Sequence, residues 1–208
     1  MLYEYLQQNY ALNEPILVSE IRLEGVSMNN IRQQIKRLTD SGKLKRFDTG
    51  IYYLPAPSLF KSGSAPSLTK VIECKYLRNG QDFCGYLTGV AFANQIGVTT
   101  QVPMIYEVVT NKATTECKKT TLGRTRILLR KPRAMVTAAN AKPLQLLDFL
   151  KEADLLAEAK GQDLSQRILA YMRRSSLAFQ DLEPYLSLYP DKLFRNMYET
   201  GLLYGISA

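Results

Sequence analysis

Side chains that can recognise a nucleic acid gather in residues 28–46. This stretch carries six basic residues against one acidic residue, Asp40, and it also carries four side-chain amides. Asn and Gln can form paired hydrogen bonds with adenine and Arg with guanine, while Lys and Arg also contact phosphates. The predicted DNA-binding residues are Asn29, Asn30, Arg32, Gln33, Lys36, Arg37, Lys43, Lys45 and Arg46. Their chemistry is typical of binding to double-stranded DNA.

The apolar residues between them predict a helix. Met28, Ile31, Ile35 and Leu38 step by three, four and three, which places them on one inward stripe. Ser27 is a suitable N-cap, and Gly42 a suitable left-handed C-cap. The amides and the cations up to Arg37 then occupy the opposite face, with Arg32 at its edge. The alternative is a solvated polar face on an ordinary helical bundle.

The surrounding elements predict a winged helix-turn-helix over residues 1–55. One helix is expected over 2–10 and a second from Glu14-Pro15 through Ile21, because Pro is tolerated in a first helical turn. After the third helix, two β-prone runs flank Asp48-Thr49-Gly50 and predict a hairpin. Lys43, Lys45 and Arg46 on this hairpin would reach phosphates or the minor groove. In this arrangement the third helix enters the major groove.

The rest of the chain predicts an α+β protein with three parts. Residues 56–66, rich in Pro, Ser, Ala and Gly, are expected to form a linker. Helices over 67–77 and 82–95 and strands over 104–109, 116–120 and 126–129 predict a basic α+β domain, 67–139, with a small antiparallel sheet. Residues 140–208 predict a helical C-terminal region, with helices from 141 and over 162–173, 178–186 and 192–202.

The positive charge is regional. Of the net charge of +8, the middle of the chain (55–139) holds 12 basic against 4 acidic residues, whereas 1–54 hold 7 against 6 and 140–208 hold 8 against 9. A second basic patch comprises Arg124, Arg126, Arg130, Lys131 and Arg133. On a strand the first three would share one face, opposite Ile127 and Leu129. A solvated face, an extra phosphate contact and a docking surface for an acidic partner all fit.

Several kinds of site are disfavoured by composition. The 208 residues include no His, so a Ser-His-Asp triad and an HExxH zinc site are excluded. Three separated cysteines without a CxxC fit a reducing compartment. With no signal peptide or membrane span apparent, a cytoplasmic protein is expected. The expectation is a non-enzymatic protein without catalytic residues, metal or cofactor.

A metal-dependent nuclease is the one catalytic alternative. Glu116-Cys117-Lys118 is an E-x-K on a predicted strand, and Asp82 or Glu107 would supply a second carboxylate for a divalent metal. The signal is weak, because Glu73-Cys74-Lys75 repeats it on a predicted helix. The nuclease therefore ranks third.

Further segments carry a resemblance to a known family. They are the hairpin Gly50-Ile51-Tyr52-Tyr53-Leu54-Pro55, Gly85-Tyr86-Leu87-Thr88-Gly89, the run from Ala93-Asn94 through Gly97 to Thr99-Thr100-Gln101-Val102-Pro103, Thr110-Asn111 and Arg130-Lys131-Pro132-Arg133. Together they make residues 1 to about 135 resemble the AbiEi-like antitoxins of type IV toxin–antitoxin systems. The run from Ala93 to Pro103 is the most specific part. The helices from 140 onward carry no such resemblance.

The resemblance implies a bacterial protein with two roles. It implies repression of its own operon through promoter repeats, and opposition to a nucleotidyltransferase-like toxin, with or without a stable complex between them. A ligand-responsive winged-helix transcription regulator without a toxin partner is the alternative. Winged-helix repressors often read paired half-sites, so a homodimer or cooperative binding on DNA would fit.

Overall fold

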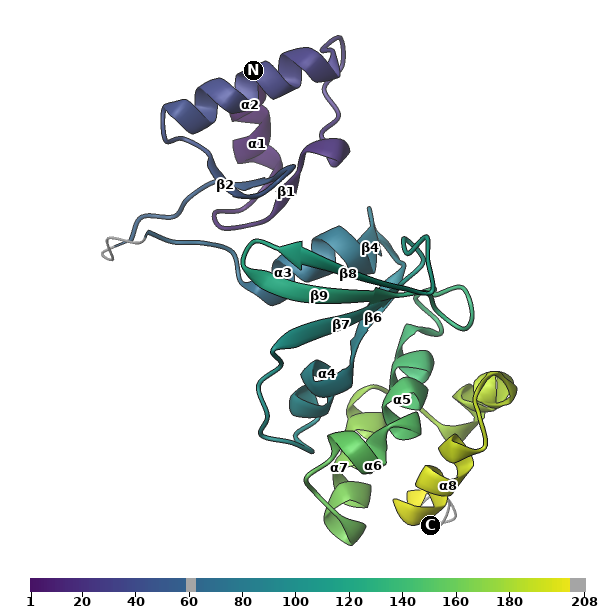
Figure 1. Ribbon diagram of the computed structural model, residues 1–208. Helices are drawn as coiled ribbons and strands as arrows, with labels where there is room; N and C mark the ends of the chain where they lie inside the picture. The colour runs from purple at the N-terminus through teal and green to yellow at the C-terminus, as the bar shows by residue number, and fades with distance from the viewer. Residues whose placement is uncertain (59–62, 203–208) are drawn as a thin grey trace. The chain divides into compact units, whose positions relative to one another are not determined.

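The computed structural model describes residues 1–58 and 63–202. Four residues of the predicted linker 56–66, 59–62, lie outside the described part. The chain is a mixed α+β protein that divides into two compact units, Met1–Lys75 and Tyr76–Ala208 (Figure 1). Within the described ranges, every helix is too short or too polar to cross a membrane.

The first unit combines three α-helices with a three-stranded sheet. Its elements are α1 (Leu2–Asn9), β1 (Ile16–Leu17), the 3-10 turn Val18–Glu20, α2 (Met28–Asp40), β2 (Lys45–Asp48), β3 (Ile51–Tyr53) and α3 (Leu68–Ile72). The sheet order is β1-β3-β2, and both pairings are antiparallel. Side chains from α1, β1 and α2, with Leu44 and Leu54, form its hydrophobic core. The predicted helices over 2–10 and after Ser27 are confirmed.

The predicted helix from Glu14 to Ile21 is wrong. Asn13 has a positive φ of 58°, and its backbone N–H donates to Leu54 O at 2.8 Å, which ties this segment to the hairpin. Ile16 and Leu17 then pair with β3, and only a single 3-10 turn follows. Pairing with a strand distant in sequence therefore overrides the local helical pattern. Met28, expected to face inward, is also 36% exposed.

The second unit packs a four-stranded sheet against helices. After the π-helical segment Glu73–Leu77, which spans the boundary, its strands are β4 (Arg78–Asn79), β5 (Asp82–Phe83), β6 (Gly85–Thr88), β7 (Ile105–Thr110), β8 (Cys117–Leu122) and β9 (Thr125–Arg130). Its helices are α4 (Gly89–Gln95), α5 (Ala141–Lys151), α6 (Ala153–Leu156), α7 (Gly161–Arg174), α8 (Lys192–Glu199) and the 3-10 segments Phe179–Asp181 and Glu183–Leu188. The larger sheet has the order β6-β7-β9-β8.

Three predictions for this unit need correction. Residues 82–83 and 85–88 form strands, and only 89–95 are helical. A Cβ at Gly85 would lie 2.5 Å from Val109 O, so β6 needs glycine where it approaches β7. The sheet is not wholly antiparallel, because β9 lies between β7 and β8 and therefore runs parallel to β7. Residues 179–188 form 3-10 turns rather than the predicted helix over 178–186.

The boundary predicted at 139/140 does not separate two hydrophobic cores. Phe92 of α4 makes edge-to-face contacts with Phe149 of α5 and Tyr171 of α7, with ring centroids 6.0 and 5.1 Å apart. Val109 of β7 packs with Leu144 of α5 in a second cluster. The helices after residue 140 therefore share hydrophobic clusters with α4 and with the strands β6 and β7.

Candidate nucleic-acid interface

Helix α2 is fixed at both ends and along its inner face. Ser27 Oγ accepts a hydrogen bond from the Asn30 backbone N–H at 3.3 Å, as an N-cap does. Ile31 and Ile35 are 2% and 3% exposed and anchor the helix in the core. Gly42, with φ of 73°, adopts the left-handed conformation that reverses the chain after the helix. The outward side chains therefore project from a well-supported element.

The opposite side of α2, hereafter its outer face, is exposed over its whole length. It comprises Asn29, Asn30, Arg32, Gln33, Lys36 and Arg37. Asn30 accepts a hydrogen bond from Gln34 Nε2 at 2.9 Å, and Arg32 reaches Asn29 Oδ1 only at 3.5 Å. Gln33, Lys36 and Arg37 have no side-chain hydrogen bond or ion pair with any residue in the described ranges. Their donors and acceptors are available to a partner.

The β2–β3 hairpin carries one cation at its tip. Thr49-Gly50 forms the turn, in which Asp48 Oδ1 accepts from the Thr49 N–H at 2.8 Å and Gly50 has φ of 74°. The exposed Arg46 donates from Nη2 to Thr49 Oγ1 at 2.8 Å. This hydrogen bond holds the guanidinium beside the turn, where it leaves several N–H donors free.

The other two hairpin cations are oriented differently. Lys45 lies opposite Tyr53 in the register and Arg46 opposite Tyr52, so they point to opposite faces of the hairpin. Lys45 is half-buried. Lys43 Nζ lies 5.1 Å from the Tyr3 ring centroid, a cation–π contact with α1. Of the three predicted hairpin contacts, Arg46 alone combines exposure with a place at the turn.

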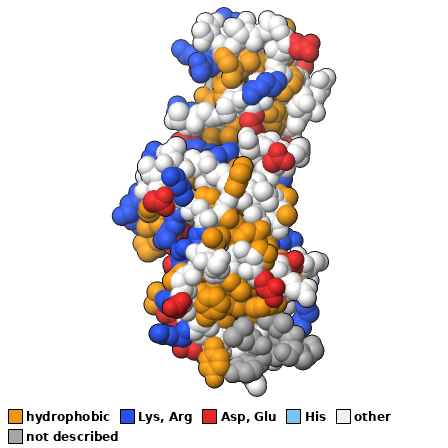
Figure 2. Space-filling model, turned by 90° about the vertical axis from the view of Figure 1, so that its right-hand side faces the viewer, with side chains coloured by type: hydrophobic (Ala, Val, Ile, Leu, Met, Phe, Trp, Pro, Cys, Tyr) orange, Lys and Arg blue, Asp and Glu red, His pale blue; other side chains and the backbone are white. Residues whose placement is uncertain are grey.

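The second basic patch is divided in the structure. Arg124 and Arg126 are exposed. Arg130, Lys131 and Arg133 instead face carboxylates, at 2.9 Å from Glu107, 3.6 Å from Glu116 and 4.0 Å from Asp148. On the face shown in Figure 2, Lys and Arg side chains are interspersed with Asp, Glu and hydrophobic side chains. The five residues do not form one continuous basic surface.

The carboxylates suggested for a nuclease lie in two separate places in the second unit. Glu107 and Glu116 are paired with the basic residues just described, and Asp82 lies in the separate β4–β5 hairpin. In the part of the chain that the structure describes, no three Cys, Asp or Glu side chains come together as metal ligands. Glu107 and Glu116 line one pocket, each beside the basic residue with which it pairs.

The run that carried the family resemblance closes a turn after α4. Asn94 Nδ2 donates to Thr99 O at 3.4 Å and to Gln101 O at 3.1 Å, and Gly97 has φ of 77°. Thr100 donates from its backbone N–H and its hydroxyl to Glu158 Oε2, at 2.7 and 3.0 Å. These contacts hold the loop between α4 and β7, so the motif has a structural role.

Sequence reasoning missed the charged residues in the second half of α5 and directly after it. Asp148, Lys151 and Glu152 line a pocket in the second unit together with Glu107 and Arg130. A signal was present, because Asp148 interrupts a run of buried Leu and Phe from Leu144 to Leu150. Burial raises the pKa of Asp148 although Tyr86, Lys151 and Arg133 act to lower it. Tyr86 donates to Asp148 Oδ2 at 2.8 Å.

Comparison with protein families gives a match over most of the chain. Residues 11–171 match the model of a family described as a family of unknown function, DUF6088. The match begins after α1 and continues into α7, so it takes in both compact units. No curated protein matches the chain.

Proposed function

The chain belongs to the DUF6088 family, and we propose that it is a transcription regulator that binds double-stranded DNA through its first unit. The observation that carries the proposal is the outer face of α2, where amides, Lys and Arg are exposed on a capped helix beside a hairpin with an arginine at its turn. Amides and guanidinium groups on one helix face suit direct reading of base edges.

The topology of the first unit supports a winged-helix assignment. The order α1, β1, α2, β2, β3 with the sheet β1-β3-β2 leaves α2 outside the sheet, and Thr49 and Gly50 of the β2–β3 turn are exposed. The segment between β1 and α2 is a 3-10 turn in place of the usual helix. In this assignment α2 enters the major groove and the hairpin is the wing.

Each side chain then has a separate role. Gln33 and Arg37 contact base edges, because they lie near the centre of the outer face and have no competing partner among the described residues. Lys36 and Arg46 contact phosphates. Lys43 and Lys45 contribute less than the sequence predicted, since one contacts Tyr3 and the other points to the opposite side of the hairpin.

The salt dependence of DNA binding tests the proposal. Full-length protein is titrated into labelled DNA from its own upstream region at several salt concentrations. Arg46→Ala is expected to weaken binding and to reduce the slope of log K against log salt by about 1, as the loss of one phosphate contact does. The exposed Arg126→Ala, in the second unit, is the matched control and should leave the slope unchanged. Equal binding by the wild type and the Arg37/Lys45/Arg46 triple alanine variant would refute the proposal.

An antitoxin role is the more specific proposal, and its support is the resemblance of residues 1 to about 135. In that role the protein represses its own operon and opposes a nucleotidyltransferase-like toxin. A neighbouring nucleotidyltransferase gene expressed alone should inhibit growth of the host cells, and co-expression of this protein should restore that growth. The Arg37→Ala variant should still restore growth but should no longer repress the operon. Failure of the wild type to rescue growth would remove the antitoxin role and leave DNA binding intact.

A further inference from the structure

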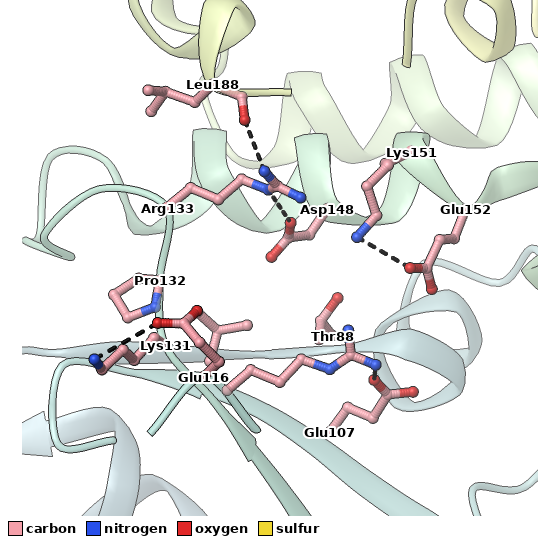
Figure 3. Close-up of a pocket in the computed structure, with 12 residues that line it drawn as sticks. Thr88, Glu107, Glu116, Lys131, Pro132, Arg133, Asp148, Lys151, Glu152 and Leu188 are labelled. Atoms are coloured by element: carbon pink, nitrogen blue, oxygen red, sulfur yellow. Dashed lines mark hydrogen bonds and ion pairs between the residues drawn. The ribbon is translucent and has the colours of Figure 1, made fainter. Parts of the chain in front are cut away.

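A polar pocket lies between the sheet and α5 in the second unit. Its volume is about 400 Å³. Glu107 and Arg130 approach it from β7 and β9, Asp148 and Lys151 from α5, Glu152 from the junction of α5 and α6, and Arg133 from the loop between β9 and α5. Figure 3 shows the α5 side chains facing Glu107 and Thr88 across this space. Four basic and four acidic side chains line it.

Arg130 is held in the pocket wall with donors to spare. Its Nη2 is 2.9 Å from Glu107 Oε2, while its Nε is buried and has no hydrogen-bond partner among the described residues. A buried donor without a partner costs about 1–3 kcal/mol. The terminal Nη groups of this partly exposed side chain, by contrast, keep N–H donors available to a ligand.

Arg133 is positioned by three contacts. Its Nη1 donates to Leu188 O at 2.7 Å, its guanidinium carbon lies 4.7 Å from the Tyr189 ring centroid, and its Nε is 4.0 Å from Asp148 Oδ1. These contacts fix the plane of the guanidinium before any ligand arrives. On α5, Lys151 Nζ lies 3.0 Å from Glu152 Oε1 and adds a third cation.

The balance of donors and acceptors favours an anionic ligand. Each of the four carboxylates already faces a cation: Glu107, Glu116, Asp148 and Glu152. An arginine has five N–H donors and a lysine three, so pairing with one carboxylate leaves most of them unused. Burial also raises the pKa of Asp148, which disfavours its negative charge.

We propose that this pocket binds the phosphate group of a small phosphorylated molecule. Arg130, Arg133 and Lys151 donate hydrogen bonds to the phosphate oxygens. A phosphate offers three strong acceptor oxygens and suits planar guanidinium groups. The lining has few apolar side chains, so the rest of the molecule is small and polar. The site does not rest on the DNA-binding proposal, because all its residues lie in the second unit.

Calorimetric titration of the full chain with inorganic phosphate and ribose 5-phosphate tests this site. Saturable binding of both is expected, with little binding of acetate. Arg130→Gln should weaken binding at least about tenfold, equivalent to about 1.4 kcal/mol. The matched control, Arg126→Gln, removes an exposed charge from the same strand outside the pocket and should bind as the wild type does.

A second variant separates ligand binding from misfolding. Glu152→Gln removes a competing carboxylate and frees Lys151, so it should tighten phosphate binding several-fold, whereas the exposed Glu183→Gln should not. A damaged fold cannot produce tighter binding. The proposal is overturned if the wild type shows no saturable binding with either phosphate ligand at concentrations up to about 10 mM. A dissociation constant above that concentration would be too weak for a specific site. It is also overturned if acetate binds equally well, or if Arg126→Gln loses as much affinity as Arg130→Gln.

Discussion

Among single residues, Asp148 has an unusual environment for a carboxylate. It lies on α5 between buried Leu147 and Phe149, and its own side chain is only 12% exposed. The Tyr86 hydroxyl and the more distant Arg133 guanidinium compensate part of the lost hydration. Burial nevertheless dominates and raises the pKa of Asp148. The charged form is thus less favourable in the folded chain than in the unfolded one.

This environment predicts a stabilising substitution. With a raised folded pKa, the folded state binds more protons, so stability decreases as pH rises through that pKa. Asp148→Asn removes the buried charge and can still accept from Tyr86. It should raise the free energy of unfolding at pH 7 by about 1 kcal/mol, and the gain should vanish below about pH 4. Urea denaturation at both pH values measures it, with exposed Asp82→Asn as control; a less stable Asp148→Asn variant at pH 7 would contradict this prediction.

Base recognition is also a property of single residues. Gln33→Ala and Arg37→Ala should each weaken binding to the specific site by about 1–3 kcal/mol and binding to unrelated DNA much less, because bidentate contacts with bases carry the discrimination. Fluorescence anisotropy with both DNAs measures the ratio. Gln8→Ala, an exposed amide on α1, is the control. Equal losses on the two DNAs would assign these side chains to phosphate contact instead.

At the level of elements, those specified by neighbouring residues could be predicted from the sequence, whereas those that depend on pairing with distant strands could not. Helix α2 and the hairpin followed from a cap, an apolar stripe and a glycine turn, all of which lie within a few residues. Strands β1 and β6 did not, because the residues that pair with them in β3 and β7 lie 19 or more residues away. For the same reason the polar outer face of α2 was predictable from one helix, whereas the pocket joins α5 to strands and loops across the unit.

The hairpin turn gives a prediction for one element. Gly50 has φ of 74°, and no heavy atom lies within 4 Å of a Cβ built there, so a substitution would act through the backbone alone. Gly50→Ala should lower the free energy of unfolding by about 1 kcal/mol, and Gly50→Asn by less, because Asn tolerates this conformation better. Thermal unfolding of the two variants measures the difference. Equal stability of Gly50→Ala and the wild type would contradict the turn geometry.

At the scale of the whole molecule, the most basic part of the chain is not the part proposed to read DNA. Residues 55–139 hold 12 basic and 4 acidic residues, yet the face proposed to read DNA lies within 28–46. In the second unit, three of the five patch residues face carboxylates. The overall net charge of +8 therefore does not locate the DNA-binding surface. The DUF6088 match covers residues 11–171 and so includes part of each unit.

Mapping the DNA contact by nuclear magnetic resonance tests the central claim most directly. Amide and side-chain signals of the labelled full chain would be followed while DNA from its upstream region is added. The largest changes should fall on Asn29 to Arg37 of α2 and on Arg46 to Gly50 of the hairpin. Changes confined to the second unit, with the α2 signals unmoved, would contradict the proposal that α2 reads DNA.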